Sequence, residues 1–144
     1  NDISQKIKND NKIYKKRDDF EFSLIRYSIK NSIPLIGICR GMQLINIFFE
    51  GKISKIQDHV RRKHKIFFLK KNKNIFTDKV NSFHNWGIKF KDLGKNLDIL
   101  ATDKENNIES FIHKSKKIIG IMWHPERNKL FNKKDVILFK KLLK

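Results

Sequence analysis

The sequence is poor in cysteine, in acidic residues and in long apolar runs. Its single cysteine, Cys39, excludes an intramolecular disulfide and a cysteine-rich zinc site. No apolar run approaches the roughly 18 residues that a membrane-spanning helix requires, so no membrane partner is expected. The polar run Asn1 to Lys6 lacks the apolar stretch of a signal peptide. Together these absences predict a reduced, cytoplasmic setting.

Basic residues, by contrast, are abundant: 33 Lys and Arg stand against 15 Asp and Glu, which gives a formal net charge of +18. Such a charge attracts nucleic acids in general. However, the lysines are spread along the chain, and no zinc-finger spacing, aromatic RNA-binding motif or clear helix-turn-helix accompanies them. We therefore expect no specific nucleic-acid partner and only weak attraction to polyanions. The densest basic run, Arg61 to Lys65, is either a solvated loop or a contact for an anionic substrate.

Apolar spacing predicts alternating helices and strands in one domain, residues 1–144. The first helix, 17–30, is expected to begin with acidic residues that favour its dipole and to bury one side. The acidic residues are Asp18, Asp19 and Glu21, and the side expected to be buried holds Phe20, Leu24, Tyr27 and Ser28. We further expect strands over 33–38, 65–70, around 75, 97–102, 108–113 and 118–123, a helix over 42–49, a loop over 81–87, and an irregular segment over 1–12. An amphipathic helix over 132–144 either packs on the sheet or binds a membrane surface.

A short glycine-x-cysteine-x-glycine run, Gly37 to Gly41, separates a predicted strand from a predicted helix. This arrangement is typical of a nucleophile elbow, in which Cys39 sits on a sharp, strained turn. Bulky side chains at positions 37 and 41 are expected to collide, so both positions are glycine. The N-terminus of the following helix lowers the thiol pKa and offers free N–H groups to an oxyanion. The alternative is a buried core cysteine, which is the commonest environment for a lone cysteine.

A thiol nucleophile needs a base, and His124 is the strongest candidate among the five histidines. It ends an apolar strand, so it is expected at an edge of the sheet. Glu126 follows two residues later, on the same side of an extended chain, and can orient the imidazole. These features predict a catalytic triad of Cys39, His124 and Glu126. The alternative for His124 is a structural histidine.

Three runs of the sequence together resemble the class I glutamine amidotransferases: 36–43, 81–84 and 120–126. Within these, the chain is most similar to the γ-glutamyl hydrolase branch, peptidase family C26. The resemblance implies an α/β flavodoxin-like, three-layer fold with a largely parallel central sheet. It also implies hydrolysis of a γ-glutamyl amide bond through a cysteine thioester. We expect neither a metal nor a cofactor.

The resemblance also implies roles for residues around the triad. The backbone N–H of Arg40 becomes one oxyanion donor, and Gln43 contacts the bound glutamyl group. The segment Ser82, Phe83 and His84 holds the α-amino and α-carboxylate groups, largely through backbone atoms. Residues 81–86 and 121–127 are similar to hydrolases that release glutamate from γ-glutamyl cytidine-diphosphate amidate in capsule phosphoramidate synthesis. Such a polyanionic substrate suits the basic run at 61–65.

The family's second oxyanion donor comes from a Gly-Gly loop, and Asn1-Asp2 resembles the residues that follow this loop. The chain is therefore expected to be the C-terminal portion of a longer domain, with an N-terminal segment missing. Two alternatives to the hydrolase remain. One is a glutaminase subunit that supplies ammonia to a partner synthetase. The other is a non-catalytic module, either an inactive remnant or a basic binding protein.

Overall fold

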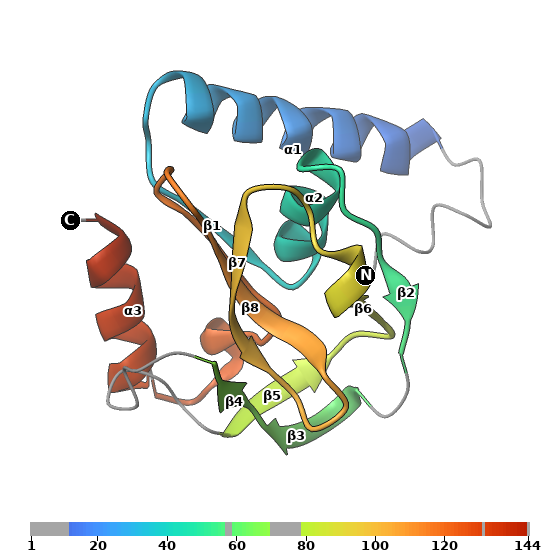
Figure 1. Cartoon of the computed structure of the whole chain (residues 1–144), viewed down its shortest axis with the longest axis vertical. Helices are drawn as coiled ribbons and strands as arrows, with labels where there is room; N and C mark the ends of the chain where they lie inside the picture. Colours follow the sequence, from blue (N-terminus) through green and yellow to red (C-terminus); the bar gives the residue numbers. More distant parts are fainter. Residues whose placement is uncertain (1–11, 57–58, 70–78, 131, 144) are drawn as a thin grey trace.

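The computed structural model describes residues 12–56, 59–69, 79–130 and 132–143 (Figure 1). The helices are α1 (Lys12–Lys30), α2 (Arg40–Phe48) and α3 (Lys133–Leu143), with short 3-10 turns η2 (Phe90–Asp92) and η3 (Pro125–Arg127). The strands are β1 (Leu35–Ile38), β2 (Ser54–Lys55), β3 (Val60–Lys65), β4 (Phe67–Phe68), β5 (Lys79–Phe83), β6 (Trp86–Lys89), β7 (Leu97–Thr102), β8 (Asn107–His113) and β9 (Ile118–Ile121). The α/β class predicted from the sequence is confirmed.

Seven of these strands form one sheet around β8, which pairs with β6, β7 and β9. Strand β1 lies beyond β9 and pairs with it in parallel, from Leu35 opposite Ile118 to Ile38 opposite Ile121. The other pairs among the described strands are antiparallel, including the separate two-stranded sheet of β3 and β5. The expected largely parallel pairing is therefore found only between β1 and β9 within the described residues.

The sheet buries apolar side chains on both faces, because successive residues of a strand point to opposite sides. Ile118 of β9 packs into the cluster beneath α1 and α2, whereas Ile119 packs into a second cluster. Leu138 of α3 is buried in that second cluster, and the Nε1–H of Trp123 donates to Oδ1 of Asp135 at 3.2 Å. The predicted packing of the terminal helix on the sheet is confirmed. Over the described ranges, no helix is long and apolar enough to cross a membrane.

Helix α1 begins earlier and faces the core differently than predicted. Its buried side holds Asp18, Ile25 and Ser28, whereas Phe20 and Tyr27 are exposed. The start at Lys12 also places the acidic residues beyond the first turn, so their predicted interaction with the helix dipole is wrong. The side of α1 that is buried packs Phe22, Ile25 and Ile29 against the core, and Asp18 on the same side pairs with Arg40 of α2.

Most of the other differences between the predicted and the observed secondary structure concern strands with polar sequences. The predicted loop over 81–87 is instead the end of β5 and the start of β6, with only His84 and Asn85 between them. Asn81 and Ser82 look unsuited to a buried strand, but their side chains make hydrogen bonds to backbone groups. The predicted strand 65–70 is divided into the end of β3 and the short β4. The strand expected near 75 and the segment 1–11 lie outside the described residues.

Candidate active site

Cys39 lies at the turn between β1 and α2 and has φ 50° and ψ −103°. Positive φ is costly for a residue with a Cβ, and such strain concentrates at functional turns. The turn is held on both sides: Cys39 N–H donates to the carbonyl of Ile121 at 2.8 Å, and the Cys39 carbonyl accepts from Gln43 N–H at 3.1 Å. Cys39 is 7% exposed. The backbone therefore has the strained conformation that a nucleophile elbow requires.

The two glycines of the elbow differ in what surrounds them. A Cβ on Gly37 would lie 2.5 Å from Cδ1 of Ile45 and 2.7 Å from the carbonyl carbon of Gly41, so a side chain there collides as predicted. A Cβ on Gly41 would meet nothing within 4 Å. The predicted collision at position 41 is therefore wrong. It is the backbone of Gly41, and not its missing side chain, that crowds the turn.

The parallel pairing of β1 and β9 places His124 at the same edge of the sheet as the elbow. Ile38 lies opposite Ile121, Cys39 directly follows Ile38, and His124 follows Ile121 by three residues. Both predicted residues thus leave the carboxyl ends of neighbouring parallel strands. Nδ1 of His124 lies 2.6 Å from Oε1 of Glu126, a contact that agrees with the predicted orienting role of the carboxylate.

Asn81 holds the backbone of His124 through two hydrogen bonds. Its Nδ2 donates to the His124 carbonyl and its Oδ1 accepts from the His124 N–H, each at 2.8 Å. The rings of Phe83 and His124 pack edge to face, with their centroids 5.7 Å apart. The guanidinium carbon of Arg127 lies 4.3 Å from the centroid of the Phe83 ring. Neither Asn81 nor Arg127 was predicted as a site residue, although Asn81 begins the run 81–84 and Arg127 ends the segment 121–127.

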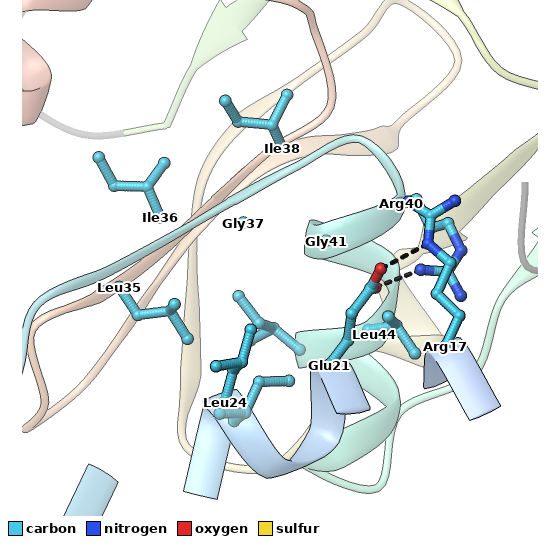
Figure 2. A pocket seen from close by; sticks show the side chains of 12 residues that line it. Arg17, Glu21, Leu24, Leu35, Ile36, Gly37, Ile38, Arg40, Gly41 and Leu44 are labelled. Atoms are coloured by element: carbon cyan, nitrogen blue, oxygen red, sulfur yellow. Dashed lines mark hydrogen bonds and ion pairs between the residues drawn. The ribbon is translucent and has the colours of Figure 1, made fainter. Parts of the chain in front are cut away.

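Arg40 begins α2 directly after the cysteine, and its side chain turns toward α1. The guanidinium pairs with Asp18 and Glu21. Glu21 also pairs with Arg17 at 2.8 Å, and Figure 2 shows both contacts of Glu21. This ion-pair cluster forms one wall of a pocket of about 300 Å³ between α1, β1 and α2. The side chain of Arg40 therefore joins two helices, and only its backbone N–H is placed at the elbow.

Three of the other predicted binding residues, Gln43, Ser82 and His84, point their side chains into the protein, whereas Phe83 is half-buried. Ser82 Oγ donates to the His59 carbonyl at 2.6 Å, and the same carbonyl accepts the His84 backbone N–H at 3.1 Å. Nδ1 of His84 and Nε2 of Gln43 both contact the Trp86 carbonyl, at 3.0 and 2.9 Å. These bonds fix the bend between β5 and β6. They agree with a binding role exerted through backbone atoms.

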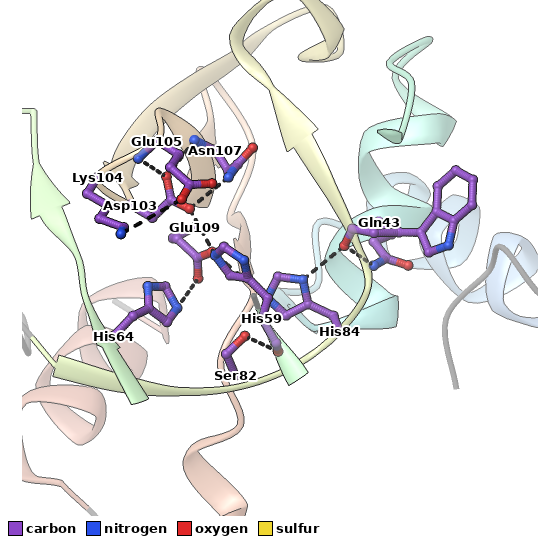
Figure 3. A network of polar contacts seen from close by, with 11 residues as sticks. Gln43, His59, His64, Ser82, His84, Asp103, Lys104, Glu105, Asn107 and Glu109 are labelled. Atoms are coloured by element: carbon purple, nitrogen blue, oxygen red, sulfur yellow. Dashed lines mark hydrogen bonds and ion pairs between the residues drawn. The ribbon is translucent and has the colours of Figure 1, made fainter. Parts of the chain in front are cut away.

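A buried polar cluster lies behind this bend (Figure 3). It consists of His59, His64, His84, Asp103 and Glu109. His59 Nε2 lies 2.9 Å from Asp103 Oδ2, while Glu109 lies between the three imidazoles at 3.6 to 3.9 Å. The sequence analysis missed both acids. An acidic residue at an inward position of an apolar strand was the signal for Glu109.

Desolvation controls the charges in this cluster. Burial raises the pKa of Glu109 to about 8 and lowers the pKa of His84 to about 3, and it also lowers the pKa of His64. The pKa of Asp103 is lowered instead: burial opposes its charge, but hydrogen bonds from His59 and Asn107 outweigh that cost. Near neutral pH the cluster thus holds one charged carboxylate and one carboxylic acid.

The basic run at 61–65 is a strand and not a loop. It forms β3, pairs with β5, and leaves the side chains of Arg61, Arg62, Lys63 and Lys65 exposed. His64 alone points inward, to the buried cluster. A bulge at Arg61, which has φ 54°, lies beside the pairing of Val60 with Phe83. The predicted solvated loop is wrong, whereas a contact with an anionic substrate remains open.

Residues 2–126 match the peptidase C26 family. The chain is 42% identical over 127 residues to the γ-glutamyl-CDP-amidate hydrolase of Campylobacter jejuni subsp. jejuni, covering 88% of this chain and 60% of that protein. It is 30% identical over 102 residues to a glutamine-hydrolysing GMP synthase subunit of Methanococcus vannielii, covering 69% and 53%. A glutamine amidotransferase from Thermotoga maritima, of known crystal structure, has a TM-score of 0.65 at 22% identity, covering 85% and 54%.

The chain therefore spans about 60% of the Campylobacter hydrolase and about half of the other two proteins. The structural similarity confirms the predicted flavodoxin-like α/β fold. Since the match with peptidase C26 extends from residue 2 to residue 126, it includes all three sequence runs on which the resemblance was based. The chain belongs to the peptidase C26 family.

Proposed function

We propose that this protein hydrolyses a γ-glutamyl amide bond through a thioester on Cys39. The sulfur attacks the γ-carbonyl carbon, and His124 transfers the thiol proton to the leaving nitrogen as the C–N bond breaks. His124 then takes a proton from water, whose oxygen attacks the thioester. Glutamate leaves, and the thiol regains a proton from His124. Glu126 holds the imidazole in the tautomer that these transfers require.

One observation carries this proposal: the strained Cys39 turn and the His124–Glu126 pair leave adjacent parallel strands at the same end. The backbone N–H of Arg40 is the proposed oxyanion donor, supported by its place at the start of α2. Gln43 and the backbone of Ser82 to His84 are the proposed contacts for the glutamyl group. A thiol nucleophile also fits the reduced, cytoplasmic setting that the sequence predicts.

The substrate that we favour carries an anionic leaving group, as the name of the Campylobacter relative suggests. Arg127 supports this choice because its guanidinium lies on the face of Phe83, whose edge meets the ring of His124. Exposed arginines of β3 lie beside Phe83 as well. A diphosphate leaving group can accept charge-assisted hydrogen bonds from such side chains. A role in capsule synthesis stays a prediction from the sequence resemblance.

The test compares glutamate release from γ-glutamyl-CDP-amidate and from γ-glutamyl-aminobutyrate. Cys39→Ala should abolish both reactions, and Arg127→Gln should slow the first by about tenfold or more while sparing the second. Lys129→Gln, which removes an exposed cation from the same segment, is the matched control. Faster release from the aminobutyrate compound by the unmodified protein contradicts the nucleotide substrate. Equal loss on both compounds in Arg127→Gln contradicts the role of that arginine.

A glutaminase subunit is the second candidate, favoured by the similarity to the Methanococcus GMP synthase subunit. Such a protein releases little glutamate by itself and is stimulated by its synthetase. Labelling with a glutamine-like diazo-ketone separates both enzymes from a non-catalytic module, because it should modify Cys39 in either enzyme. A folded protein that resists the label at Cys39 is a non-catalytic module. The prediction that residues 1–144 form the C-terminal portion of a longer domain is part of this proposal.

A further inference from the structure

Glu109 occupies an unusual place for a carboxyl group. It lies in β8, the strand with the most partners in the main sheet, and is 1% exposed. Neither of its oxygens has a hydrogen-bond partner among the described residues. Burying an ionised carboxylate that accepts no hydrogen bond costs free energy. The environment of Glu109 must therefore favour the protonated acid or supply a hydrogen-bond partner.

The tautomer of His84 defines what Glu109 faces. Nδ1 of His84 lies 3.0 Å from the carbonyl oxygen of Trp86, and a carbonyl can only accept. The proton of the neutral ring is therefore on Nδ1. The other nitrogen, Nε2, carries a lone pair, is buried without a hydrogen-bond partner among the described residues, and lies 3.9 Å from Oε1 of Glu109. An ionised Glu109 and this lone pair repel each other, whereas a carboxylic acid can donate to it.

The same carbonyl connects His84 with the proposed substrate site. Trp86 O accepts from His84 Nδ1 and also from Gln43 Nε2 at 2.9 Å (Figure 3). Gln43 is fully buried and lies on α2, one helical turn after Cys39. A change in the ring of His84 thus alters the acceptor that orients the Gln43 amide.

We propose that Glu109 is a positioning residue for the glutamyl site: as a carboxylic acid it donates its proton to Nε2 of His84, and through the Trp86 carbonyl this bond fixes Gln43. The hydrogen bond requires an approach of about 1 Å, since such bonds measure about 2.8 Å. The inference rests on the proposed function, because Gln43 is assigned to the substrate there.

The groups around Glu109 are consistent with an uncharged acid. His84 and His64 face it from the β5–β6 bend and from β3, and burial lowers the pKa of both rings, which keeps them neutral. His59 faces it at 3.8 Å, but its Nε2 also contacts the charged Asp103. Burial raises the pKa of Glu109 to about 8, so the acid form dominates at neutral pH. Ionisation above that pH should release His84.

Two substitutions separate the effect of the hydrogen-bond donor at position 109 from the effect of side-chain size. Glu109→Gln keeps an N–H donor for His84 and does not ionise, whereas Glu109→Leu removes every donor. We expect a five- to tenfold rise in KM for Glu109→Leu, the effect of one lost hydrogen bond, with a smaller change in kcat. At pH values above about 8 the KM of the unmodified protein should increase, whereas the KM of Glu109→Gln should stay constant. Glu50→Gln, which changes an exposed carboxylate that pairs with Lys95, is the control and should leave the pH profile unchanged.

A measurement independent of turnover keeps this inference separate from the proposed function. Ring ¹⁵N chemical shifts of His84 should report an Nδ1–H tautomer at neutral pH and change as Glu109 ionises, even if no hydrolysis occurs. An Nε2–H tautomer overturns the proposal, as does a pH profile of KM that is identical in the unmodified protein and in Glu109→Gln. Stoichiometric zinc that is lost in Glu109→Gln also overturns it, by assigning His59, His64 and Glu109, whose ligand atoms lie within 4.8 Å of one another, to a metal.

Discussion

The two glycines that flank Cys39 provide the sharpest test of the elbow, because the structure predicts opposite effects for the same substitution. In Gly37→Ala the new methyl group meets Cδ1 of Ile45 at 2.5 Å and the backbone of Gly41 at 2.7 and 2.8 Å. The end of the isoleucine side chain can move, but the backbone at the start of α2 cannot move without shifting the helix. Overpacking of this kind costs about 1–3 kcal/mol.

Gly41→Ala should do the reverse. Its methyl group meets nothing within 4 Å, and position 41 lies inside α2, where alanine is favoured over glycine by about 0.5–1 kcal/mol. The two variants should therefore differ by about 1.5–4 kcal/mol, the sum of a cost and a gain. At about 2–4 °C per kcal/mol for a chain of this size, their Tm values should differ by about 3–16 °C.

Thermal unfolding followed by far-UV circular dichroism measures this difference, with diazo-ketone labelling of Cys39 as the functional readout. Gly37→Ala should lower Tm and slow labelling, because the displaced helix start moves Cys39. Gly41→Ala should raise or preserve Tm. If the two variants lose stability equally, the position of α2 against β1 is wrong and the steric account of the elbow fails.

Three further predictions concern buried polar groups. Arg40→Gln should destabilise the protein by about 3–5 kcal/mol in urea unfolding, because it removes the cation that pairs with the buried Asp18 carboxylate. Asn46→Ala should cost at least about 2 kcal/mol in the same assay, because Asn46 accepts from the buried N–H of Gly94 and donates to two carbonyls. The pKa of Glu109, raised from 4.5 to about 8, means that the unfolded chain loses this proton at a lower pH than the folded protein, so the contribution of Glu109 to stability should fall by a few kcal/mol from about pH 5 to pH 8, measured as the difference between the unmodified protein and Glu109→Gln. Glu109→Gln should remove that slope, and an unchanged slope contradicts burial of Glu109.

The elbow was predictable from the sequence because its determinants are local. An apolar strand, a glycine two residues before a cysteine, and a helix directly afterwards lie within one short run, and Gly37 acts through atoms of that same run. The exposed side of α1 was not predictable in this way. Phe20 and Tyr27 have the spacing of a buried face, but Phe22, Ile25 and Ile29 have it as well and are the residues that pack on the core. Asp18, on that same side, pairs with Arg40 of α2, and periodicity contains no information on such a distant contact.

The buried cluster was not predicted for the same reason. Its histidines and acids come from β3 and the residue before it, the bend after β5, the β7–β8 turn and β8, and they meet only because β3 pairs with β5 beside the main sheet. Apart from Glu109, which lies in an apolar strand, these residues resemble surface sequence. His64 stands within a run of exposed cations, and Asp103 lies in a turn. Burial of these side chains follows from strand pairing, which composition does not reveal.

The parallel register of β1 and β9 explains why Cys39 and His124 could be assigned to one sheet edge from the sequence. Two strands that run in the same direction end at the same edge, so a residue after one is a neighbour of residues after the other, whatever the length of chain between them. Cys39 and His124 each follow such a strand, and the pairing of Ile38 with Ile121 aligns the two ends. For these two residues, knowing which strand each one follows was enough to place them at the same edge. For Glu109, in the middle of a strand, it was not.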